Sequence, residues 1–152
     1  RLIGERDGFI FLFQEGENRN IYLCNVGFNV LLGVVFEKAV ALNPTLSRAQ
    51  LNLGVALAKQ GKTEAAIEPL KAAARLNTES PQASFFLGSV YAAQNRYTEA
   101  EEAFNQALRI DGSFALAHQR LAELFEVQGN KDAALRHYRE TARLMRQSGP
   151  AR

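Results

Sequence analysis

Residues 53–76 read LGVALAKQGKTEAAIEPLKAAARL, and a similar stretch follows at residues 87–110, LGSVYAAQNRYTEAEEAFNQALRI. A third copy occupies residues 121–144, LAELFEVQGNKDAALRHYRETARL. The copies begin 34 residues apart and keep their small and large residues in phase. A fixed period of this size predicts a stack of repeated supersecondary units rather than a globular domain around one core.

Each copy carries two apolar stripes with helical spacing, so we expect two helices per copy. The first helix contains Gly54 and Leu57, and the second contains Ala66 and Leu70. Because Gly54 and Ala66 have almost no side chain, the two helices can approach closely there while the leucines fill the surrounding space. The pattern predicts an antiparallel helical hairpin with two apolar faces, which has to stack on its neighbours to bury both.

The turn between the two helices is marked by Gly61 in the first copy and by Asn95 in the second. Both residue types tolerate the left-handed backbone that commonly ends a helix. The same turn gives residues 56–63, ALAKQGKT, a partial likeness to a phosphate-binding loop with alanine at the first glycine position. A phosphate loop requires a preceding strand, so we expect a helix–turn–helix here and no nucleotide site.

The order of Leu-Gly, a large residue, a turn residue, Ala, a second large residue and Ala resembles the tetratricopeptide repeat (TPR). The resemblance implies an all-α fold, namely an α-solenoid of antiparallel helical hairpins wound into a right-handed TPR superhelix. It places TPR units at residues 47–80, 81–114 and 115–148. Three units are near the minimum that buries a continuous core.

One feature of the family pattern is modified in this chain, and another is kept. The early position at which the family carries tryptophan holds Gln50, Ser84 and His118 in the three units. Pro44 and Pro81 stand near unit boundaries, where we expect each proline to stop the preceding helix.

The residues before the clear repeats fit the pattern less well. We interpret residues 13–46 as a degenerate first TPR unit, in which Phe28 to Asn43 should form a helix. Residues 1–12 are interpreted as an extension or the tail of a preceding domain, and residues 149–152 as a tail.

Two competing interpretations concern this N-terminal part. Residues 9–13 and 21–23 are rich in strand formers and flank a turn cluster, as the strands of a β-hairpin would. The uncharged run from Asn20 to Phe36 is near the lower length limit for a membrane span, but it contains asparagines, so a buried helix pair is favoured.

Composition gives no sign of catalysis. The net charge of +2 provides no drive toward nucleic acid or an acidic membrane surface. Cys24 is the single cysteine, and His118 and His137 have no ligand-spaced partner in the sequence, so we interpret all three as structural or surface residues. Because no convergent set of titratable residues is visible, we expect no enzymatic activity, no cofactor and no metal site.

The last expected helix is rich in cations. We interpret them as a solvated helix face, and a basic patch for an acidic partner as the alternative. The cations are Lys131, Arg136, Arg139, Arg143 and Arg146, against Asp132 and Glu140.

In the TPR family, the first helices of successive units line a concave groove that accepts a peptide or helix of another protein. Carried over by position, the first unit contributes Arg48, Leu51, Asn52, Val55 and Lys59. The second contributes Gln82, Phe85, Phe86 and Ser89. The third contributes Leu116, Gln119, Arg120, Glu123 and Val127.

The neighbouring rings of Phe85 and Phe86 point about 100° apart on a helix, and we expect at least one of them to face the groove. In the alternative interpretation, both rings seal the seams between units against Leu51 and Leu116. Under the groove interpretation, Phe85→Ala or Arg120→Glu would abolish partner capture and leave melting almost unchanged. A clamp for chaperone tails is disfavoured, because Phe86 stands where a second polar residue is expected.

The resemblance implies a protein–protein interaction scaffold that binds a peptide or helix of a partner in the concave groove. The alternative is an accessory TPR module of a larger enzyme or sensor. We expect no nucleic acid and no membrane as partners. Self-association through the last unit stays open, because Leu144 and Met145 lie where no polar capping helix follows.

Overall fold

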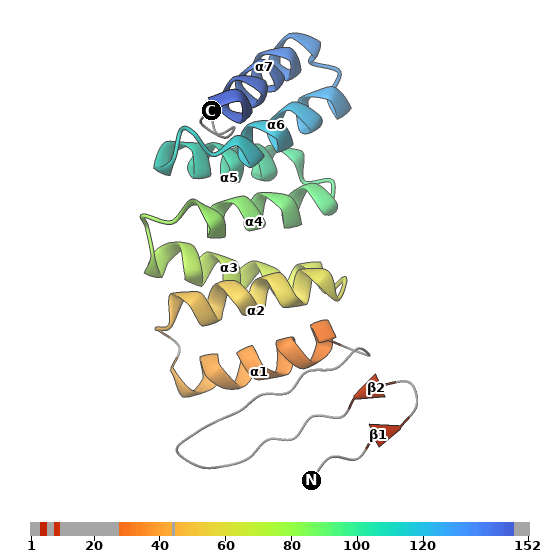
Figure 1. Cartoon of the computed structure of the whole chain (residues 1–152), viewed down its shortest axis with the longest axis vertical. Helices are drawn as coiled ribbons and strands as arrows, with labels where there is room; N and C mark the ends of the chain where they lie inside the picture. Colours follow the sequence, from red (N-terminus) through yellow and green to blue (C-terminus); the bar gives the residue numbers. More distant parts are fainter. Residues whose placement is uncertain (1–3, 6–7, 10–27, 44, 148–152) are drawn as a thin grey trace.

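The computed structural model describes residues 4–5, 8–9, 28–43 and 45–147. The described helices are α1 (Phe28–Leu42), α2 (Ser47–Lys59), α3 (Thr63–Leu76), α4 (Pro81–Ala93), α5 (Tyr97–Ile110), α6 (Ala115–Val127) and α7 (Lys131–Gln147). Two short strands, β1 (Gly4–Glu5) and β2 (Gly8–Phe9), form an antiparallel pair with Gly4 opposite Phe9. The helices are stacked in chain order along the long axis of the molecule (Figure 1).

The helix bounds repeat with the period of the sequence. Helices α2, α4 and α6 begin at residues 47, 81 and 115, and helices α3, α5 and α7 begin at residues 63, 97 and 131. Every helix from α1 to α7 contacts the next one along the chain. The expected α-solenoid of antiparallel helical hairpins is therefore confirmed, and residues 28–42 form the helix expected there.

The turns inside the three hairpins have the same backbone geometry. Gly61, Asn95 and Gly129 have φ angles of 77°, 59° and 76°, in the left-handed region. After α2, the Lys62 N–H donates to the Leu57 carbonyl at 3.0 Å, and the Gly61 N–H donates to the Ala58 carbonyl at 3.0 Å. This pair of bonds is a Schellman motif, and it recurs after α4 and α6. The phosphate-loop-like residues 56–63 thus form the end of α2, a turn and the start of α3.

Glycine permits close contact between the helices of the first two hairpins. A Cβ atom on Gly54 would lie 2.5 Å from Leu70 Cγ and 3.2 Å from the Ala66 carbonyl oxygen. A Cβ atom on Gly88 would lie 2.7 Å from the Phe104 ring. The close approach expected at Gly54 and Ala66 is confirmed, and each glycine lies directly over the large residue of the partner helix.

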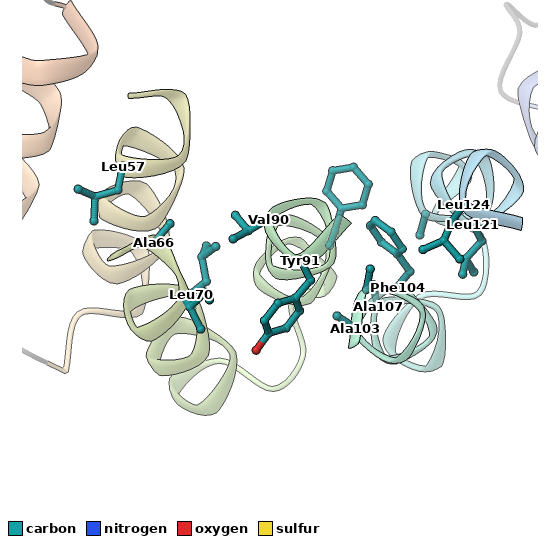
Figure 2. Packing of buried hydrophobic residues seen from close by; sticks show 14 of the residues in the cluster. Leu57, Ala66, Leu70, Val90, Tyr91, Ala103, Phe104, Ala107, Leu121 and Leu124 are labelled. Carbon is teal, nitrogen blue, oxygen red and sulfur yellow. The ribbon is translucent and has the colours of Figure 1, made fainter. Parts of the chain in front are cut away.

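One apolar cluster runs through the stack from α2 to α6. Its largest fully buried side chains are those of Leu70, Phe104 and Leu121. Figure 2 shows Leu57, Leu70, Val90, Phe104 and Leu121 following one another from α2 to α6. Truncating a buried leucine or phenylalanine of this kind to alanine costs about 2–5 kcal/mol, so neighbouring hairpins depend on each other for stability.

Several expectations need correction or fall outside the described residues. Pro81 does not stop α3, which ends at Leu76; it is the first residue of α4, where the N–H that proline lacks has no helical partner. Pro44 lies outside the described residues. The hairpin proposed for residues 9–13 and 21–23 falls mostly on undescribed residues, and Phe9 pairs with the upstream Gly4.

The sequence raised the question of a membrane-spanning helix between Asn20 and Phe36, and the described helices were compared with the length and apolarity that a span requires. Among them, none is both long enough and apolar enough to cross a bilayer.

Candidate partner-binding groove

The contacts between helices show which side of the stack is concave. Helix α4 contacts both α2 and α6, whereas among the described helices α3 does not contact α5, and α5 does not contact α7. The first helices of the hairpins therefore lie closer together than the second helices do, and the array curves around them. The residues that α2, α4 and α6 turn away from their partner helices share the concave face, which we call the groove.

The residues predicted to line the groove differ in burial. Exposed ones are Arg48, Lys59, Gln82, Leu116, Arg120 and Val127. Half-buried ones are Leu51, Asn52, Val55, Phe86, Ser89, Gln119 and Glu123. These side chains are at least partly accessible to a partner, and their role in binding stays a prediction.

Phe85 is the exception, because its side chain is only 7% exposed. Its ring lies 5.2 Å from that of Phe114, 5.9 Å from that of Phe104 and 5.4 Å from that of Phe86, measured between centroids. Phe85 therefore seals the seam between α4, α5 and the start of α6. This burial leads us to expect that Phe85→Ala lowers the melting temperature, in contrast to the expectation from the sequence, and Phe86 is the ring with surface left for the groove.

A pocket of about 410 Å³ opens between α4 and α6. Its lining consists of Ser89, Ala92, Ala93, Tyr97, Phe104, Arg120, Glu123, Leu124 and Val127. Of the predicted residues, the structure thus brings together Ser89, Arg120, Glu123 and Val127. It does not bring the predicted α2 residues into this pocket.

Sequence reasoning missed Ala92, Ala93 and Tyr97 as lining residues. Ala92 and Ala93 stand three and four positions after Ser89, so helical spacing alone could have found them. Their small side chains leave the space that the pocket occupies. Tyr97 begins α5, and its hydroxyl donates to Asn95 Oδ1 at 2.8 Å, which holds the ring beside the turn.

The polar side of the pocket is organised around Glu123. Its carboxylate accepts a hydrogen bond from Arg120 at 2.7 Å and another from Gln119 Nε2 at 2.9 Å. Partial burial acts to raise the pKa of Glu123, but the bonds from Gln119 and Arg120 outweigh it and the pKa lies below its usual value. Glu123 is therefore ionised near neutral pH, and its charge offsets that of the Arg120 guanidinium.

The two histidines meet between α6 and α7, which sequence reasoning missed because they are far apart in the chain. His118 Nδ1 lies 3.0 Å from His137 Nδ1, and His118 Nε2 lies 3.2 Å from the Gly112 carbonyl oxygen. A carbonyl only accepts, so the Nε2–H of His118 donates to Gly112, and the two Nδ1 atoms share one proton between them. Burial, followed by the charges of His118 and Arg136, lowers the pKa of His137.

The sequence also drew attention to Cys24 and to residue types that bind metal ions. Cys24 lies outside the described residues. Among the residues that are described, no cluster of three or more His, Cys, Asp or Glu side chains could hold a metal ion.

The sequence and the fold were compared with known protein families, curated proteins and solved structures. The family model described as "Tetratricopeptide repeat" matches residues 35–81 and 51–113, which together span about half of the chain. No curated protein matches the sequence.

Solved structures of MamA share the fold. A crystal structure of MamA has 25% sequence identity and a TM-score of 0.72, covering 78% of this chain and 69% of that chain. A second one has 26% identity and a TM-score of 0.75, covering 84% and 71%. MamA from Desulfovibrio magneticus RS-1, from residue 41 to its end, has 23% identity and a TM-score of 0.76, covering 83% and 71%. At 23% identity, the last likeness concerns the fold alone.

Proposed function

The chain belongs to the tetratricopeptide repeat family, and from that premise we propose that it holds a peptide or helix of a partner protein in the groove of α2, α4 and α6. A protein-interaction scaffold is the general role that this fold supports. The observation that carries the finer proposal is the pocket of about 410 Å³ between α4 and α6. It is concave and has an apolar floor with a few polar groups at one side, as binding sites commonly do.

The chemistry of the pocket indicates what its occupant should be. Ala92, Tyr97, Leu124 and Val127 form an apolar surface, and the side chain of Val127 is 66% exposed before any partner binds. Since the charge of Arg120 is already offset by Glu123, the pocket favours an uncharged apolar side chain over an acidic one. Ser89 has a hydroxyl whose proton goes to the Phe85 carbonyl at 3.0 Å, so its oxygen is left to accept a bond from the partner.

The test begins with a random peptide library displayed on phage and selected on the intact chain. The affinity of one selected peptide is then measured for the parent chain, Arg120→Glu and Val127→Asp. Both variants should bind about tenfold more weakly or worse, as expected for contacts at the centre of an interface. The matched control is Arg139→Glu, an exposed charge reversal on α7 away from the groove. Equal affinities in all four proteins would refute the groove assignment.

The alternative proposal, an accessory module of a larger enzyme or sensor, is favoured by one observation. Strands β1 and β2 pair with each other and follow no helix–turn–helix pattern, so they are structure of another kind ahead of the solenoid. Sequencing the complete transcript tests it: a catalytic or sensor domain encoded next to this region would support the alternative, and its absence would remove it.

Self-association is a further proposal, and it concerns the outer face of α7. Leu135 is 47% exposed and Met145 is 53% exposed, whereas Ile67, two periods before Leu135, is 5% exposed in the stack. Leu144 is buried and offers little surface, which corrects the expectation for that residue. A sedimentation mass that rises with protein concentration supports contact through α7, and a monomer throughout contradicts it.

We also propose that the chain binds no nucleic acid. One of the arginines of α7, Arg143, is paired with Glu140 on the same helix, and the net charge of the chain is only +2. Salt-sensitive retention of labelled DNA or RNA by the chain would contradict this proposal.

A further inference from the structure

The two histidines of the chain form a pair between α6 and α7, outside the groove. His118 and His137 are the only histidines in the sequence, and their Nδ1 atoms lie 3.0 Å apart. Both side chains are half-buried, so packing holds them while solvent still reaches them. Since imidazole is a common ligand of transition-metal ions, two imidazole nitrogens this close together form a candidate metal site.

The repeat does not require imidazoles at these two positions. Ser84 stands 34 residues before His118, and Ala103 stands 34 residues before His137. In the first hairpin, a glutamine and a proline hold the same places. All three hairpins nevertheless keep the same turn geometry and the same helix starts. The histidine pair is therefore a feature of the last hairpin that the packing of the repeat does not explain.

The distance between the two Nδ1 atoms matches the spacing of two ligands on one metal ion. An imidazole nitrogen binds such an ion at about 2.0–2.1 Å. Two nitrogens about 90° apart, as in square-planar and octahedral geometry, are then about 2.8–3.0 Å from each other. The observed separation is 3.0 Å. A small turn of the two rings directs both lone pairs at an ion beside the line that joins the nitrogens.

His118 is held in the tautomer that a metal ligand needs. Its Nε2–H donates to the Gly112 carbonyl oxygen at 3.2 Å, which leaves Nδ1 to present a lone pair. Metal-binding histidines usually donate their other ring N–H to a carbonyl or carboxylate in this way. The proton that the two Nδ1 atoms share moves to Nε2 of His137 when an ion binds, so both rings stay neutral.

The surroundings hold the second ring and set the charge near the pair. The ring of His137 stacks on that of Phe125, with 5.6 Å between centroids. The charge of Glu140 interacts with His118, and that of Arg136 interacts with His137. These charges have opposite signs, so the affinity depends mainly on the two imidazoles. No third His, Cys, Asp or Glu side chain of the described residues joins them, and water therefore completes the coordination.

We propose that His118 and His137 bind one late first-row divalent transition-metal ion through their Nδ1 atoms, and that the ion links α6 to α7. Imidazole suits Cu²⁺, Ni²⁺ and Zn²⁺, and the affinity of a given site is highest for Cu²⁺. The proposal departs from the expectation of no metal site, which rested on spacing along the chain. It is independent of partner binding in the groove.

Calorimetric titration of the untagged chain with Cu²⁺ tests the proposal. One ion should bind per chain with a Kd below about 1 mM, and Ni²⁺ and Zn²⁺ should bind more weakly. The melting temperature should rise with the Cu²⁺ concentration, because the ion binds the folded chain, and a chelator should reverse the rise. Absence of saturable one-to-one binding would overturn the proposal.

Variants that copy the middle hairpin locate the ion. His118→Ser and His137→Ala give the last hairpin the side chains that Ser84 and Ala103 provide in the middle one, so each variant should keep the fold. Each should bind Cu²⁺ at least about tenfold more weakly, since loss of even a group behind a ligand costs about 10- to 100-fold in affinity. The control is Cys24→Ser, which removes the single thiol of the sequence and should leave the affinity unchanged.

The remaining outcomes also decide. Unchanged affinity in both histidine variants, or a loss only in Cys24→Ser, would place the ion elsewhere and overturn the assignment. A loss in only one histidine variant would show a single-imidazole contact and overturn the two-ligand site. If circular dichroism shows that a variant is unfolded, NMR of the parent chain decides. Bound Cu²⁺ should first broaden the amide signals around His118 and His137, and broadening confined to other residues would overturn the proposal.

Discussion

The close contact between Gly54 and Leu70 determines whether adding a methyl group at Gly54 raises or lowers the free energy of unfolding. In Gly54→Ala, the added Cβ would lie 2.5 Å from Leu70 Cγ and 2.7 Å from Leu70 Cδ2. Leu70 is fully buried and cannot move aside. Overpacking of this kind costs about 1–3 kcal/mol, whereas replacing a helical glycine by alanine contributes about 0.5–1 kcal/mol of stability. We therefore expect Gly54→Ala to lower the free energy of unfolding by about 1–2 kcal/mol.

The matched control is the same substitution at Gly33 in α1. There the added Cβ would meet only the end of the flexible Gln60 side chain, at 2.5 Å from Nε2. The end of a flexible side chain yields more easily than the fully buried Leu70, so Gly33→Ala should lower the free energy of unfolding by less than Gly54→Ala does. One chemical change is thus expected to have different costs in two helices.

Urea unfolding followed by circular dichroism measures both effects. Combining Gly54→Ala with Leu70→Ala should cost less than the sum of the single changes, because the shorter side chain makes room for the new Cβ; coupling between touching residues is typically about 0.5–3 kcal/mol. If Gly54→Ala is as stable as the parent, or the double change is additive, the tight contact between α2 and α3 is refuted.

Three further predictions follow from the same structure. Phe85→Ala should lower the free energy of unfolding by about 3–5 kcal/mol, measured by urea unfolding; a loss below about 1 kcal/mol would contradict its place in the seam. Because the pKa of His137 is lowered from 6.5 in the folded chain, the unfolded chain binds more protons, and stability should fall as pH drops through 6.5 toward the folded value. His137→Phe should flatten the pH dependence of the urea midpoint below pH 6.5, and an unchanged slope would contradict the assignment. Gly61→Ala should cost about 1–2 kcal/mol, because it puts a Cβ on left-handed backbone; Asn95→Gly should be neutral or slightly stabilising, and equal costs would contradict this reading of the turns.

The sequence was sufficient to predict the helical hairpins and their turns, because those depend on local spacing. Glycine and asparagine are the residue types that favour left-handed backbone, so Gly61 and Asn95 predict the two turns. The close approach of Gly54 and Ala66 is predicted because both residues have almost no side chain. These features repeat three times, so each copy supports the interpretation of the others.

Contacts between distant residues could not be predicted in the same way. Phe85 and Phe86 differ by about 100° around α4, and the burial of Phe85 is decided by Phe104 and Phe114 on other parts of the chain. The pairing of His118 with His137 depends on the register between α6 and α7. The residues next to Phe85, His118 and His137 in the sequence do not indicate which distant residues they contact.

The candidate pocket likewise combines positions that the sequence predicts with contacts that it does not predict. The positions of Ser89, Arg120 and Glu123 on the groove side followed from the family resemblance. Their convergence in one pocket depends on the small side chains of Ala92 and Ala93 and on the ring of Tyr97. A search of the sequence for polar or charged binding groups does not select alanine or a single tyrosine, so these lining residues were missed.

The most direct test of the central claim is an NMR titration of the isotope-labelled chain with a peptide selected on it. Binding in the groove predicts that the largest chemical-shift changes occur at Ser89, Ala93, Arg120 and Val127, on α4 and α6. Residues on the outer faces of α3 and α5 should change little. Changes confined to those outer faces, with the groove residues unmoved, would contradict the assignment of the concave face as the partner-binding site.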